Sequence, residues 1–162
     1  MFRRNITLLV VPALLLLAAP AVAGASAGAK SHAVNLRGLI DTISSKGTTG
    51  TPGATETDSG IFAGTISGRS TRGAFYQYAT FGSGLTLTGN GVAFDAGGSI
   101  RFKLSAKFAP AAGGTASYTG TFTATGGTGL YKNAHGTLGI SGTTLTSDPD
   151  AATFNESGTL KY

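Results

Sequence analysis

The sequence contains no cysteine, no tryptophan, one methionine and only two histidines. Without cysteine the chain can form neither a disulfide nor a thiolate metal site, and no lipid can be attached at a lipobox cysteine. His32 and His135 stand apart and no carboxylates cluster beside them, so we expect no zinc site, no other metal and no cofactor. Packing and strand pairing must therefore hold the folded part together.

Charge is low and evenly spread. The formal net charge is +5, and it falls to +3 when Arg3 and Arg4 are left out. The remaining basic residues are scattered rather than gathered in a patch, which argues against a nucleic-acid partner.

A long apolar run occurs only at the N-terminus. Arg3 and Arg4 precede an apolar stretch over 6–19, and small residues over 21–23 follow it, which is the pattern of a secretory signal peptide. The run is shorter than the roughly 20 residues that span a membrane, and prolines interrupt it. We therefore predict a signal peptide over 1–23, secretion from a bacterium and no membrane anchor after cleavage; Sec and Tat export both stay open.

The rest of the chain is rich in glycine and threonine, with aromatic and β-branched residues at short intervals. No window has a helical apolar period, whereas alternation is clear in 99–108, where Ile100, Phe102 and Leu104 share one face. Residues 24–33 are expected to be a flexible lead-in and 44–59 a long loop. The expected strands lie at 34–43, 60–68, 73–81, 85–95, 99–108, 117–125, 136–146 and 152–161.

Eight antiparallel strands, each with one buried face, are best closed as a barrel, because closure leaves no exposed edge. An open sandwich is the alternative. The sequence thus predicts an all-β, eight-stranded antiparallel β-barrel over 34–162.

The most distinctive stretch runs from Gly126 to Gly136. It lacks the Lys-Ser/Thr pair and the βαβ unit of a phosphate-binding loop. Glycines at this density instead allow positive φ in a tight turn and let an aromatic side chain fold back over the backbone. We expect a structural role for Gly126, Gly127, Thr128, Gly129, Tyr131, Ala134 and Gly136.

These residues resemble the Gly-Gly-Thr-Gly-x-Phe-Arg-x-Ala-Arg-Gly signature of plant dirigent proteins, with Tyr131, Lys132 and His135 at the three substituted positions. The chain is here similar to the dirigent and allene oxide cyclase barrel superfamily. That resemblance implies a calycin-like eight-stranded barrel, often a trimer, with a ligand cavity and without metal or cofactor. It transfers no functional residue, because the pocket motifs of the family have no counterpart in this chain.

Glu156 is the candidate catalytic residue. Phe154, Glu156 and Leu160 are separated by even numbers of residues, so in a regular strand they share one face and Glu156 points inward with the two apolar residues. A carboxyl group that faces an apolar cavity has a raised pKa and can act as an acid or a base. The alternative is a bulge, or a place at the barrel mouth beside a basic residue.

Tyr76, Tyr78 and Arg37 are the candidate ligand-binding residues. The two tyrosines share one face of the strand 73–81, and they either belong to the core or form an exposed pair for a subunit or a sugar. Arg37 shares a face with Asp41, and it either forms a salt bridge with Asp41 or reaches a cavity.

No nucleophile-elbow motif is present, so the sequence leans away from an enzyme. The preferred hypothesis is an exported, cofactor-free barrel that binds a small apolar or aromatic molecule or serves as an extracellular interaction module. One alternative is a cofactor-free isomerase or cyclase that uses Glu156 with a tyrosine. The other is a carbohydrate- or surface-binding module built on Tyr76 and Tyr78.

Overall fold

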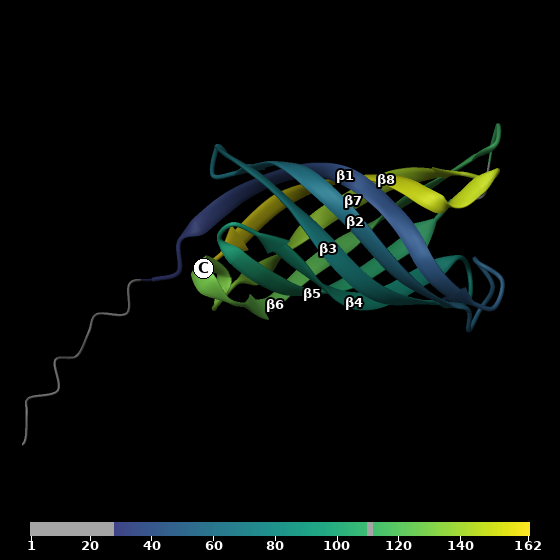
Figure 1. Ribbon diagram of the computed structural model, residues 1–162, viewed down its shortest axis with the longest axis horizontal. Helices are drawn as coiled ribbons and strands as arrows, with labels where there is room; N and C mark the ends of the chain where they lie inside the picture. Colours follow the sequence, from purple (N-terminus) through teal and green to yellow (C-terminus); the bar gives the residue numbers. More distant parts are fainter. Residues whose placement is uncertain (1–27, 110–111) are drawn as a thin grey trace, which may run out of the picture.

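A computed structural model describes residues 28–109 and 112–162, which form one elongated β-barrel (Figure 1). The predicted signal peptide, 1–23, lies outside the described residues. The strands are β1 (Ser31–Lys46), β2 (Thr55–Ile66), β3 (Arg69–Phe81), β4 (Thr86–Asp95), β5 (Gly98–Phe108), β6 (Thr115–Gly127), β7 (His135–Leu145) and β8 (Asp148–Lys161), with the short 3-10 helix η1 (Gly129–Tyr131) between β6 and β7.

Each strand pairs antiparallel with the next one in sequence, and β1 pairs with β8 to close the barrel. The predicted fold class is therefore confirmed, and the sandwich alternative is wrong. Closure follows from the alternating pattern, because every strand buries one face and finds a hydrogen-bonding neighbour on both sides.

The barrel begins earlier than the sequence indicates. Residues 31–33, expected in the flexible lead-in, are the first residues of β1 and pair with Thr159 to Lys161 of β8. The ring of His32 stacks on that of Tyr162 with centroids 3.9 Å apart. Polar residues form a strand here because β8 continues far enough to supply backbone partners.

The connection between β1 and β2 is also shorter than expected. Only residues 47–54 lie between the two strands, so the predicted long loop over 44–59 is wrong at both ends. The polar run from Thr55 to Ser59 pairs with β1 on one side and with β3 on the other. Two complete hydrogen-bond ladders outweigh its low apolar content, and this extension carries Glu56 and Asp58 into the barrel.

Five interior aromatic rings lie opposite glycines. A glycine leaves room for a ring on the neighbouring strand to cover its Cα, so the barrel packs large rings without widening. A Cβ built on any of these glycines would overlap the facing ring. The register partners are Phe154 and Gly38, Phe75 and Gly60, Phe62 and Gly73, Phe102 and Gly91, and Tyr118 and Gly142.

The glycine-rich motif leads the chain from β6 into η1 at the end of the barrel where the C-terminus lies (Figure 1). Gly126 and Gly129 have positive φ angles of 118° and 58°. Tyr131, on η1, is buried and donates a hydrogen bond of 2.6 Å to Oδ2 of Asp95. Asp95 also accepts bonds from the Thr71 hydroxyl at 2.8 Å and the Gly97 amide at 2.7 Å. The motif thereby holds an aromatic side chain at this end of the barrel.

Candidate functional site

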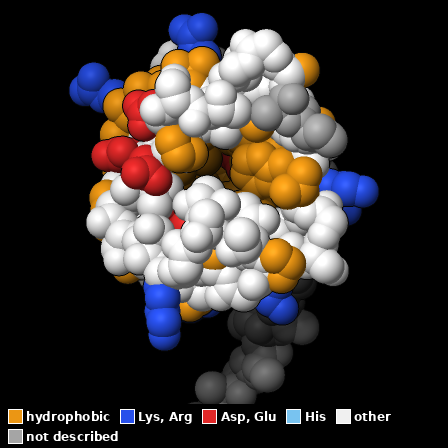
Figure 2. All heavy atoms as spheres, turned by 90° about the vertical axis from the view of Figure 1, so that its right-hand side faces the viewer, with side chains coloured by type: hydrophobic (Ala, Val, Ile, Leu, Met, Phe, Trp, Pro, Cys, Tyr) orange, Lys and Arg blue, Asp and Glu red, His pale blue; other side chains and the backbone are white. Residues whose placement is uncertain are grey.

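The barrel encloses a cavity of about 300 Å³. Its lining reaches from Tyr131 at one end to Thr49 and Gly50 in the connection between β1 and β2, and to Asp150 near the start of β8, at the other. Figure 2 looks onto this second end and shows a narrow hollow with hydrophobic side chains beside it. A small molecule therefore has a route between solvent and the interior from the side of these connections.

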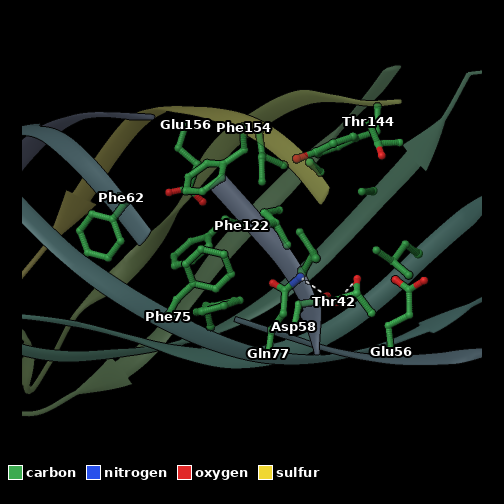
Figure 3. A pocket seen from close by; sticks show the side chains of 18 of the residues that line it. Thr42, Glu56, Asp58, Phe62, Phe75, Gln77, Phe122, Thr144, Phe154 and Glu156 are labelled. Atoms are coloured by element: carbon green, nitrogen blue, oxygen red, sulfur yellow. Dashed lines mark hydrogen bonds between the residues drawn. The ribbon is translucent and has the colours of Figure 1, made fainter. Parts of the chain in front are cut away.

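Most of the lining is apolar, and the strands explain why. Alternate residues of every strand face inward, and most of these are Phe, Leu, Ile, Val or Ala. A few polar side chains interrupt this surface. Figure 3 shows Glu56 and Thr144 toward one side of the cavity and Glu156 with Phe62 and Phe75 toward the other. The site is thus an apolar chamber with acidic groups at different depths.

Asp58, on β2, is 2% exposed and has its hydrogen bonds satisfied within the barrel. Its carboxyl group accepts from Nε2 of Gln77 at 2.8 Å and from the Thr42 hydroxyl at 2.8 Å, as the dashed lines of Figure 3 show. Burial raises the pKa of Asp58, and these two donors oppose that rise. These hydrogen bonds link β1, β2 and β3 inside the barrel, so we assign Asp58 a role in stabilising the fold.

Glu56 lies near the start of β2, at the end of the barrel that Figure 2 shows. Burial raises the pKa of Glu56 to about 7, although the Thr49 side chain donates to it, and the charges of Asp58 and Asp150 raise it further. Both protonation states of this carboxyl group are consequently populated near neutral pH.

Glu156, on β8, projects into the cavity and is 6% exposed. Its register partners on the neighbouring strands are Leu36 and Ile140, both buried and apolar. Burial alone raises the pKa of Glu156 to about 7. No hydrogen bond from the described residues reaches its carboxyl group, and the carboxyl oxygens face the open space of the cavity. Glu156 is an acidic group held in an apolar environment without a partner.

The isomerase hypothesis requires a tyrosine beside Glu156. Both tyrosines of the cavity lining are engaged elsewhere: Tyr118 donates to the Thr153 carbonyl oxygen at 2.8 Å, and Tyr131 donates to Asp95. Burial and the charge of Glu156 both raise the pKa of Tyr118, so this phenol keeps its proton. The predicted acid–tyrosine pair is not assembled.

The other candidate residues lie outside the barrel. Tyr76 and Tyr78 are each 48% exposed, while Phe75 and Gln77 occupy the inner face of β3. Arg37 is exposed on β1, and none of the three lines the interior cavity. Strand alternation turns all three side chains outward, so the tyrosines form the exposed pair that was one of the two alternatives. Ligand binding by Tyr76, Tyr78 or Arg37 stays a prediction. Arg37 and Asp41 share the outer, exposed face of β1, as their alternate positions predict.

The sequence pattern does not identify Glu56, Asp58 and Gln77 as interior residues. It predicts a loop at Glu56 and Asp58, and it leaves open which face of the strand 73–81 carries Gln77 inward. A weak signal existed, since Glu56, Asp58, Gly60 and Phe62 occupy alternate positions and therefore share one face of a strand. Extending β2 backward by this parity would have placed both carboxyl groups inside.

No protein-family model matches the chain, and no curated protein matches it. Among solved structures, the chain is similar to pyocyanin demethylase, with 18% sequence identity and a TM-score of 0.47 over 78% of this chain and 99% of that one. A likeness at this level bears on neither family nor activity. The closed antiparallel barrel of eight strands is what the structure establishes.

Proposed function

We propose that this chain, after export, binds a small apolar or aromatic molecule inside the barrel. The cavity of about 300 Å³ with its largely apolar lining is the observation that carries the proposal. Ligand sites are typically concave, mostly apolar and furnished with a few polar groups, as this chamber is. The resemblance of the Gly126–Gly136 motif to dirigent and allene oxide cyclase barrels, whose members hold ligands in the same place, supports it further.

Binding is testable with the neutral fluorescent probe N-phenyl-naphthylamine, whose emission rises when it leaves water. We expect saturable fluorescence enhancement with the purified protein. In the variant Ala93→Phe, a ring added to the cavity lining between Phe75 and Ile100 should weaken binding by about tenfold, because it occupies volume that the probe needs.

The matched control is Ala74→Phe, which adds the same ring to the exposed face of β3. It should leave the affinity for the probe unchanged. Equal affinities of wild type and Ala93→Phe would place the probe outside the barrel and contradict the proposal.

A homo-oligomer is a second proposal, favoured by an exposed apolar pair on the outer surface. Leu39 of β1 lies directly opposite Ile61 of β2, and they are 55% and 61% exposed. Tyr76 and Tyr78 add exposed rings on β3, which pairs with β2. Since the family resemblance implies a trimer, we propose a second copy of this chain as the occupant of this face.

Native mass spectrometry of the secreted protein tests export, ligand and assembly in one measurement. We expect the subunit mass of a chain that begins at Gly24. We also expect a species that retains a small molecule, and an assembly whose mass is a multiple of the subunit mass. An uncleaved chain would contradict the export proposal, and a monomer that persists at high concentration would contradict the oligomer.

A further inference from the structure

The titratable groups that face the cavity are acids and phenols. Among the described residues that line it, none is lysine, arginine or histidine. The groups are Glu56 and Asp58 on β2, Asp95 on β4, Tyr118 on β6, Tyr131 on η1, and Asp150 and Glu156 on β8. The described part of the chain therefore supplies no cationic side chain to the interior to balance these carboxyl groups.

Glu156 differs from Glu56, Asp58 and Asp95 in its hydrogen bonding. Asp58 accepts two hydrogen bonds, Asp95 accepts three, and Glu56 is bonded by Thr49. Glu156 has no donor within the described residues, although it is more than nine-tenths buried and points into the cavity (Figure 3). A buried ionised carboxylate without a partner is costly, and a cation that enters the cavity would offset that cost.

The surroundings of Glu156 fit an organic cation better than a metal ion. Phe154 precedes it by two residues on the same face of β8, and the ring of Phe154 meets that of Phe75 edge-on with centroids 5.6 Å apart. Aromatic faces attract ammonium groups. A divalent metal ion would require several oxygen or nitrogen ligands, and no three acidic or histidine side chains of the described residues converge to supply them.

We propose that the ligand is an organic monocation, a protonated amine or quaternary ammonium compound with an apolar or aromatic body, whose charge is paired with Glu156. The aromatic and aliphatic walls would surround the body of the molecule. This inference rests on the proposed ligand-binding function and adds the charge of the ligand to it. An anionic ligand would meet only negative or neutral groups inside the barrel, and it is disfavoured for that reason.

The pair phenyltrimethylammonium and tert-butylbenzene tests the charge directly, since the two molecules have nearly the same shape and differ by one positive charge. Each is titrated against the bound neutral probe at about pH 8, where Glu156 is mainly ionised. We expect the cation to displace the probe at concentrations about tenfold lower than the neutral molecule.

Glu156→Gln keeps the shape of the side chain and removes its charge. In this variant the affinity for phenyltrimethylammonium should fall by about tenfold, while that for tert-butylbenzene and for the probe should stay within about twofold. Retained probe binding shows that the variant is folded. The preference for the cation should also grow with pH in the wild type as Glu156 ionises. Glu56 titrates in the same range, so this dependence is assigned to Glu156 only if Glu156→Gln reduces it.

Asp41→Asn is the matched control, because it removes one negative charge from the exposed surface of β1. It should leave both affinities unchanged; an equal loss of cation affinity in this variant would mean general attraction to the surface and overturn the inference. If the probe and tert-butylbenzene bind but the cation has no advantage, the inference fails and the ligand-binding function stands. If neither the probe nor either molecule binds, the proposed function itself fails.

Discussion

Glu156→Gln is expected to raise the free energy of unfolding, and the gain is expected to grow with pH. The pKa of Glu156 is raised from 4.5 to about 7 by burial. Between these two values the folded state holds a proton that the unfolded state has released, so stability falls as pH rises through this window. The glutamine cannot ionise and avoids that loss. The difference between variant and wild type should widen by roughly 2–3 kcal/mol from about pH 5 to about pH 8.

Urea unfolding of both proteins at a series of pH values measures this difference. Glu56, whose pKa is also raised to about 7, contributes its own loss of stability over the same range. That loss is common to both proteins, so subtracting the two curves isolates Glu156. If the free energies of unfolding of the two proteins changed in parallel with pH, Glu156 would not be desolvated in the folded protein. The pairing of a cationic ligand with Glu156 would then have no support.

A side chain that lowers stability at neutral pH and has no partner within the folded chain is typical of a functional position. Asp58 illustrates the contrast, because Gln77 and Thr42 satisfy it and link three strands. Structural requirements account for Asp58. They do not account for Glu156, where leucine or glutamine would serve the fold better.

Gly142→Ala should be among the most damaging single substitutions in the barrel. A Cβ at this position would overlap the Thr153 carbonyl oxygen and the ring of Tyr118, which covers the glycine. The backbone oxygen cannot yield without breaking the ladder between β7 and β8, and the ring cannot move without filling the cavity. We expect a loss of about 3 kcal/mol in the free energy of unfolding, measured by urea titration.

Gly139→Ala, on the same strand, is its matched control. A Cβ there would have only the Ser157 carbonyl oxygen near it, at 3.8 Å. Because alanine restricts the unfolded chain more than glycine, this change should be neutral or stabilising by up to about 1 kcal/mol. Equal losses in the two variants would show that the packing of rings on glycines does not govern these positions.

Several features of this protein could be predicted from local pattern alone. The alternation in 99–108 identifies a half-buried strand, and eight such segments with short connections favour closure over an open sandwich, since an open sheet would leave unpaired edges. The alternate positions of Phe154, Glu156 and Leu160 likewise predicted an inward carboxyl group in a regular strand, with a bulge or the barrel mouth as the alternative, and the structure places Glu156 inside. Each inference needed only the period of two that every strand has.

Other features depend on neighbours that are distant in sequence. The polar start of β2 becomes a strand only because β1 and β3 lie on either side of it, and this decides the positions of Glu56 and Asp58. On β3 both faces carry aromatic rings, so parity could not tell Tyr76 and Tyr78 from Phe75, whereas the closed barrel turned the tyrosines outward.

Periodicity within single segments thus predicts the number of strands, the class of the fold and the inward direction of Glu156. Contacts between segments establish which glycine faces which ring, which acids are satisfied, and that no basic side chain of the described lining accompanies Glu156. These properties arise from the register between strands and from contacts across the barrel. They depend on the positions of several segments at once, and no single stretch of sequence encodes them.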